Sequence, residues 1–118
     1  MSAQAASDRG AVVMKAFKNA TKALGMSHEK AAKVLGKSRL TLERKPGFAE
    51  DAKEYELQVL FIRAYRSLYA LMGGDENAML HWFTTRNKHL NGVPAELVMR
   101  VTGLVSINEY LDAMRAKV

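Results

Sequence analysis

Apolar residues recur at helical spacing along the first 45 residues, and small or polar residues interrupt them. The first series, residues 11–24, sets Phe17 and Leu24 on one face and lysines on another, and Gly25 follows it. A glycine after the last apolar position favours a helix end, because glycine adopts the left-handed conformation at low cost. Residues 1–10 show no such pattern and are predicted to form a flexible tail.

Two short helices are predicted next, each preceded by a serine in the position of an N-cap. Ser27 stands before residues 28–35, and Ser38 stands before residues 39–44. Gly36 separates the two, so the stretch has the order helix, turn, short helix.

This pair meets the requirements of a helix-turn-helix. Ala31 and Ala32 are small enough for the following helix to cross closely, and Leu40 and Leu42 are expected to point inward. The string AAKVLGKSRLTLERK resembles the two-helix core of Xre/Cro-type regulators, although helix pairs of this kind also occur as plain packing units. The candidate DNA-binding residues are the polar and basic ones around the last helix: Lys37, Ser38, Arg39, Thr41, Arg44 and Lys45.

Residues 50–72 are predicted to form the longest helix, and Gly73 and Gly74 end it. Two apolar stripes run along it, which is typical of a helix buried from two sides. The helix-turn-helix unit is expected on one side. Either the C-terminal module or a second copy of the protein is expected on the other.

The last third of the chain is predicted to hold three more helices. Asp75 is expected to cap a helix over residues 76–85, and Pro94 suits the first turn of the next one. Gly103 is expected to end that helix in a left-handed conformation, and Ser106 to cap the last one. The whole chain is therefore predicted to be a small all-α helical bundle.

Charge divides the chain unevenly. The first 45 residues hold ten Lys and Arg against three acids, whereas the remainder has a net charge of −1. This asymmetry favours a polyanion-binding N-terminal half, although a solvated basic face is the simpler alternative. Cysteine is absent, and no apolar run has the length of a membrane span, so a cytoplasmic protein without membrane contact is expected.

The sequence offers little for catalysis. Three histidines without cysteine or close carboxylates do not suggest a metal site, and no phosphate-binding loop or nucleophile–base pair is recognisable. We therefore expect no enzyme activity, no catalytic residues, no metal and no cofactor.

A specific combination of residues marks the C-terminal half. It consists of Trp82, Asn87, Leu90, Gly92, Pro94, Leu97 and Gly103, followed by Tyr110 and Leu111. The pattern resembles the C-terminal toxin-binding domain of the Xre/MbcA/ParS-like antitoxins over residues 69–118, which leaves residues 11–68 for the helix-turn-helix unit and central helix. Two positions depart from it: Arg86 replaces a usual proline, and Asn91 a frequent glycine.

The resemblance implies a type II antitoxin without chemistry of its own. Such antitoxins bind RES-type or related ADP-ribosyltransferase-like toxins, which act on NAD, and cover the toxin's active-site cleft. Members with a working helix-turn-helix also bind operator DNA and repress their own operon. A homodimer is expected because palindromic half-sites mirror a two-fold protein, and the toxin complex would be a hetero-oligomer. The candidate toxin-binding residues are Asn87, Arg100, Asn108, Tyr110, Leu111, Arg115, Lys117 and Val118.

Alternatives stand beside these assignments. A single tryptophan on an apolar helix face more often packs inward than binds a partner, and Asn87 suits a turn. Tyr110 and Leu111 are also suited to covering the helix that begins at Pro94. The competing function is a stand-alone DNA-binding repressor whose C-terminal half serves dimerisation.

Overall fold

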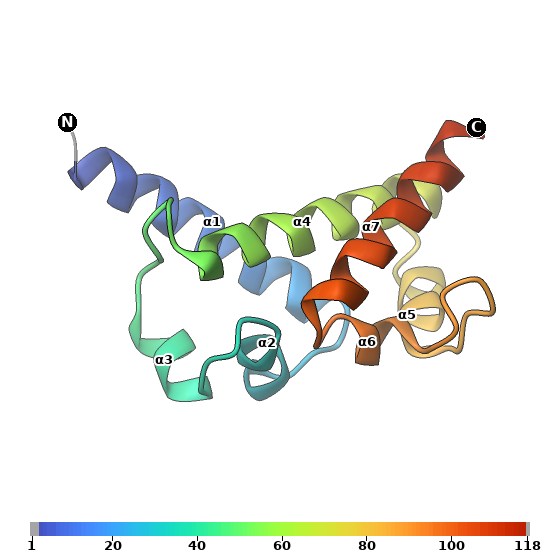
Figure 1. Ribbon diagram of the computed structural model, residues 1–118, viewed down its shortest axis with the longest axis horizontal. Helices are drawn as coiled ribbons and strands as arrows, with labels where there is room; N and C mark the ends of the chain where they lie inside the picture. Colours follow the sequence, from blue (N-terminus) through green and yellow to red (C-terminus); the bar gives the residue numbers. More distant parts are fainter. Residues whose placement is uncertain (1–2, 118) are drawn as a thin grey trace.

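The computed structural model describes residues 3–117, and the predicted all-α fold is confirmed. Figure 1 shows the helices in this range as a small bundle. Their bounds are α1 (Ala3–Ala23), α2 (His28–Val34), α3 (Arg39–Arg44), α4 (Lys53–Leu71), α5 (Glu76–Thr84), α6 (Pro94–Leu97) and α7 (Val101–Ala116).

The central helix α4 joins the two halves of the molecule. It packs against α1 on one side and α7 on the other, with α2 and α3 near one end of the bundle and α5 and α6 near the other (Figure 1). Phe61 of α4 lies edge-on to Phe17 of α1 and to Phe83 of α5, with ring centroids 5.4 and 6.5 Å apart. The C-terminal module of the same chain therefore covers a second side of α4, while Val59 and Tyr69 of this helix stay exposed.

Three predicted N-caps are confirmed. The side chains of Ser27, Ser38 and Asp75 each accept a hydrogen bond from the backbone N–H three residues later, at 3.2, 3.2 and 3.1 Å. Gly25 and Gly73 follow α1 and α4 with φ of 75° and 61°, so they provide the left-handed residues that end these helices. Capping and turn chemistry thus define the starts of α2, α3 and α5 and the ends of α1 and α4.

The predicted tail is wrong over residues 3–10, because α1 begins at Ala3; Met1 and Ser2 lie outside the described residues. Gly10 lies inside α1, buried against the loop that precedes α4. A Cβ atom at Gly10 would lie 2.4 Å from the carbonyl oxygen of Phe48, so glycine permits this close approach. The helix continues through a segment whose small and polar residues hid its periodicity.

The predicted boundaries in the last third are also corrected. α6 is a single turn, and Gly103 lies inside α7, with Ser106 exposed further along the same helix. A Cβ atom at Gly103 would lie 2.1 Å from the carbonyl oxygen of Leu97. Gly103 therefore allows α7 to pass close to the end of α6, and it does not act as a cap.

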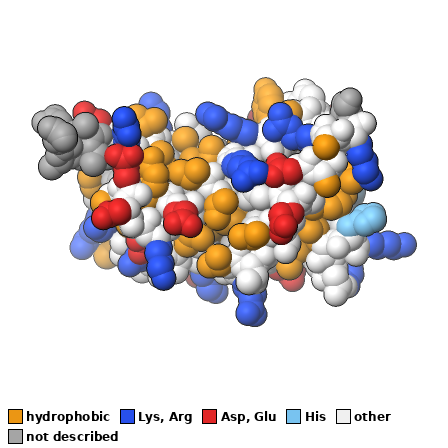
Figure 2. All heavy atoms as spheres, turned by 45° about the horizontal axis from the view of Figure 1, so that its top comes forward, with side chains coloured by type: hydrophobic (Ala, Val, Ile, Leu, Met, Phe, Trp, Pro, Cys, Tyr) orange, Lys and Arg blue, Asp and Glu red, His pale blue; other side chains and the backbone are white. Residues whose placement is uncertain are grey.

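One face of the bundle carries exposed apolar side chains. Val12 of α1 and Val59 of α4 are 68% and 42% exposed, and they line a groove of about 410 Å³. Arg63, Arg66 and Arg115 line the same groove. Figure 2 shows apolar side chains on this side of the molecule beside basic and acidic ones. Within residues 3–117, none of the helices is long and apolar enough to span a bilayer.

Candidate functional site

The α2–α3 pair has the close packing that the sequence predicts. Ala31 and Ala32 of α2 are 1% and 0% exposed, and Leu42 of α3 is completely buried. Small side chains on α2 let α3 approach closely, and Leu42 anchors it to the core. The opposite side of α3 faces solvent.

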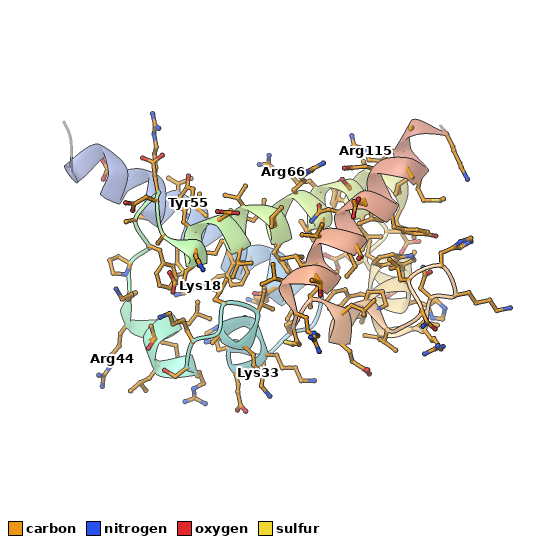
Figure 3. All side chains as sticks on the ribbon, viewed as in Figure 1. Lys18, Lys33, Arg44, Tyr55, Arg66 and Arg115 are labelled. Carbon is orange, nitrogen blue, oxygen red and sulfur yellow. The ribbon has the colours of Figure 1, made fainter. Side chains whose placement is uncertain are left out.

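Ser38 and Thr41 fix the start of α3. The Ser38 hydroxyl accepts the hydrogen bond from the Thr41 N–H, and the two side-chain oxygens lie 3.0 Å apart. Arg44 and Lys45, at the other end of α3, are exposed. Figure 3 shows Arg44 pointing away from the bundle, on the same side of the molecule as Lys33 of α2.

Two of the candidate cations already have acidic partners. Lys37 lies 3.1 Å from Glu54 of α4, and Arg39 lies 3.4 Å from Glu43, one turn further along α3. Glu43 is also 2.9 Å from His28 Nδ1. This hydrogen bond, with Arg39 nearby, lowers the pKa of Glu43 below its ordinary value and keeps it ionised. These pairs therefore reduce the positive charge around α3.

The prediction that Leu40 points inward is wrong. Its side chain is 50% exposed, whereas that of Leu42 is buried. Residues two apart on a helix point in directions about 200° apart, so only one of these leucines can face the core. Leu40 therefore lies on the solvent-exposed face of α3, near Arg44.

Further basic residues join this surface from α1. Lys15, Lys18 and Asn19 form one side of a hollow of about 440 Å³, and Arg44 and Lys45 form the other. Lys15 and Lys18 are three residues apart and so share a helix face, a signal present in the sequence. The sequence alone does not place these lysines in the DNA-binding set, because only the tertiary fold brings this face of α1 beside the end of α3.

In the C-terminal half, the loop between α5 and α6 is closed by Asn87. Its backbone pairs with that of Gly92 at 2.8 and 3.3 Å, and its side chain accepts a hydrogen bond from the Leu90 N–H at 3.1 Å. Gly92 then lies against Leu97, which a Cβ at that glycine would approach to 3.2 Å. Pro94 is buried as the first residue of α6. The loop motif thus serves the fold of this module.

Partly exposed aromatic rings lie beside this loop. Trp82 of α5 stacks on Tyr110 of α7, with ring centroids 6.3 Å apart. The ring centroid of His89 lies 5.8 Å from that of Tyr110. Trp82 and Tyr110 are only half-buried. This cluster both joins α5 to α7 and leaves aromatic surface accessible to a partner.

Two of the candidate toxin-binding residues are in the core. Leu111 is 1% exposed and Asn108 is 4% exposed, and the Asn108 amide donates to the carbonyls of Leu60 and Leu104 at 3.0 and 3.1 Å. Burial leaves these side chains no surface to offer a partner, so their predicted role as contacts is corrected. They join α7 to α4.

The remaining basic candidates do not form one patch. Arg100 precedes α7, whereas Arg115 and Lys117 lie at its other end, so Arg100 and Arg115 are separated by roughly 22 Å along the helix. Arg115 donates to the Ser67 hydroxyl of α4 at 3.3 Å and, in Figure 3, lies on the same side as Arg66. All three candidates are exposed, and Val118 lies outside the described residues.

Comparison with protein families accounts for both halves. Residues 3–63 match the antitoxin Xre-like helix-turn-helix domain, and residues 67–117 match the antitoxin Xre/MbcA/ParS C-terminal toxin-binding domain. The chain belongs to the Xre/MbcA/ParS antitoxin family. No curated relative matches the chain.

This antitoxin is thus a component of a toxin–antitoxin system, with a DNA-binding domain and a toxin-binding domain. The first match ends and the second begins inside α4, which packs against α1 of one domain and α7 of the other. Families of this regulatory type are generally not enzymatic.

Proposed function

We propose that this antitoxin neutralises a RES-type toxin by inserting the C-terminal end of α7 into the toxin's active-site cleft. The observation that carries this proposal is the match to the toxin-binding domain over residues 67–117, which includes this end of the helix. Arg115 and Lys117 are exposed there and offer positive charge to acidic groups of a cleft.

The aromatic cluster of Trp82, His89 and Tyr110 is proposed as a second part of the contact. Tyrosine, tryptophan and arginine are enriched among the residues that dominate interface energies. The family resemblance implies a toxin that consumes NAD or transfers ADP-ribose from it. Neutralisation then requires only that the antitoxin exclude the substrate, with no chemistry by its own residues.

We further propose that the helix-turn-helix represses the antitoxin's own operon as a homodimer. Exposed cations from α1 and α3 would contact phosphates, and the outer face of α3 would enter the major groove. Two copies related by a two-fold axis would match a palindromic operator. The complex with the toxin is then a hetero-oligomer.

The first test is co-expression with the product of the adjacent gene. Cells that express the neighbour alone should stop growing and lose NAD, and the antitoxin should restore both and co-purify with the neighbour. Growth arrest with normal NAD would reject the RES-type assignment while retaining the antitoxin function.

The alternative is a stand-alone repressor whose C-terminal half serves dimerisation. It is favoured by a complete helix-turn-helix whose caps and core are all present. A neighbour that is harmless and does not co-purify, together with salt-sensitive binding of this protein to its own promoter, would support that reading.

A further inference from the structure

Leu40 is the apolar residue at the centre of the exposed face of α3. Its side chain is 50% exposed, and Leu42 supplies the buried anchor of this helix. Isolated exposed leucines are common on protein surfaces, so exposure alone means little. The position of Leu40 is informative because the same face carries the charged groups that would bind DNA.

Cations lie on both sides of Leu40. Arg39 precedes it in sequence, and Arg44 follows one turn later, exposed and without an ion-pair partner among the described residues. The hydrogen bond between His28 and Glu43 ties the start of α2 to α3. The outer face of α3 is therefore held in place, with the exposed Leu40 one turn from the exposed Arg44 and with Arg39 paired to Glu43 beside it.

This arrangement matches the chemistry of the major groove. Arginine binds phosphates or the acceptor edge of guanine, and apolar side chains contact the C5-methyl group that only thymine presents there. Leucine has no group that can bond to a phosphate or to a base edge. Its chemistry is thus complementary to a methyl group.

We propose that Leu40 binds the C5-methyl group of a thymine in each operator half-site. The proposal rests on the DNA-binding function proposed above, and it adds a base-specific contact. It implies that the preferred half-site contains a thymine at the position opposite the N-terminal part of α3. Burial of one methyl group corresponds to a contribution of about fourfold in affinity.

The test uses DNA selected from a randomised duplex pool by the wild-type protein. Each thymine of the selected duplex is replaced in turn by deoxyuridine, which removes only the methyl group. We expect one position per half-site at which this change weakens wild-type binding about fourfold. Leu40→Ala should bind the thymine and uracil forms of that position equally.

Leu80→Ala serves as the matched control, because Leu80 is 40% exposed on α5, outside the helix-turn-helix. This variant should keep the full penalty for uracil. Far-ultraviolet circular dichroism and urea unfolding establish that both variants are folded before their affinities are compared.

Three results would overturn the proposal. Wild-type protein that binds its selected duplex without a penalty at any uracil position makes no methyl contact. A Leu40→Ala variant that retains the wild-type uracil penalty shows that another residue makes the contact with the methyl group. Failure to select any duplex, or binding without salt dependence, would reject the DNA-binding function itself and is distinct from the first two.

Discussion

The two halves of this antitoxin use their motif residues in opposite ways. In the helix-turn-helix, α3 directs charged residues such as Arg44 outward over two buried alanines. In the C-terminal module, the family motif points largely inward: Pro94 and Gly103 are buried, and Asn87 closes a loop.

The difference shows that most of the C-terminal motif residues identify the domain through its fold, whereas Trp82 and Tyr110 keep part of their surface exposed. The C-terminal motif specifies a compact arrangement of α5, α6 and α7. The end of α7 lies outside that motif and is exposed, and it is the contact proposed above for a partner. Substitutions in the two halves should consequently separate into effects on folding and effects on binding.

The largest expected effect is on the framework of the C-terminal module. Gly103→Ala forces a Cβ atom against the Leu97 carbonyl and should lower the free energy of unfolding by roughly 2–3 kcal/mol, as overpacking does. Ser106→Ala, at an exposed position of the same helix, should change it by less than about 0.5 kcal/mol. Urea unfolding measures both, and equal stabilities of the two variants would contradict the framework role.

A smaller effect is expected on the DNA-binding surface. Lys15→Ala together with Lys18→Ala removes two cations from the hollow beside α3 and should reduce the slope of log affinity against log salt by about 2. Stability should stay unchanged. Lys53→Ala, at the start of α4, is the single-charge control and should leave the slope unaltered. A double variant with the wild-type slope would restrict the DNA surface to α2 and α3.

The smallest effect concerns the ion pair between Lys37 and Glu54. A hydrogen bond from its own backbone, and then one from Lys37, lowers the pKa of Glu54 below its ordinary value of 4.5. The stabilisation is therefore present above pH 4.5 and is lost as the pH falls through the lowered pKa.

Glu54→Gln should accordingly cost about 0.5 kcal/mol or less at pH 7, because the pair is partly exposed. The difference from wild type should shrink when unfolding is measured below pH 4. The variant also frees Lys37 and should bind DNA slightly more tightly at pH 7. A stability difference that grows in acid would contradict this account.

Sequence was most informative where local chemistry ends a helix. Ser27, Ser38 and Asp75 are capping residues by type, and Gly25 is a helix-ending residue, so the element order and most bounds were predictable. Sequence failed at Gly103, because the turn between α6 and α7 contains neither glycine nor proline. Gly103 is needed for the close packing of α7 on α6, but in the sequence it has the same pattern as a glycine that ends a helix.

The functional surface was only partly predictable. Arg44 and Lys45 follow from their place in the third helix, whereas Lys15 and Lys18 come from α1 and meet them only through the tertiary fold. Asn108 and Leu111 were misassigned because a helix near the C-terminus can equally be a contact or a core element. Their burial against α4 decides between these possibilities.

The decisive measurement for the proposed contact at the end of α7 is the affinity of the toxin for an Arg115→Ala and Lys117→Ala double variant, by titration calorimetry. The control is the double variant Lys22→Ala with Lys53→Ala, which also removes two positive charges but at positions away from the end of α7. We expect the first variant to lose more than about tenfold in toxin affinity while retaining its stability and DNA binding. Equal toxin affinity in the two variants would contradict the assignment of the α7 end as the contact.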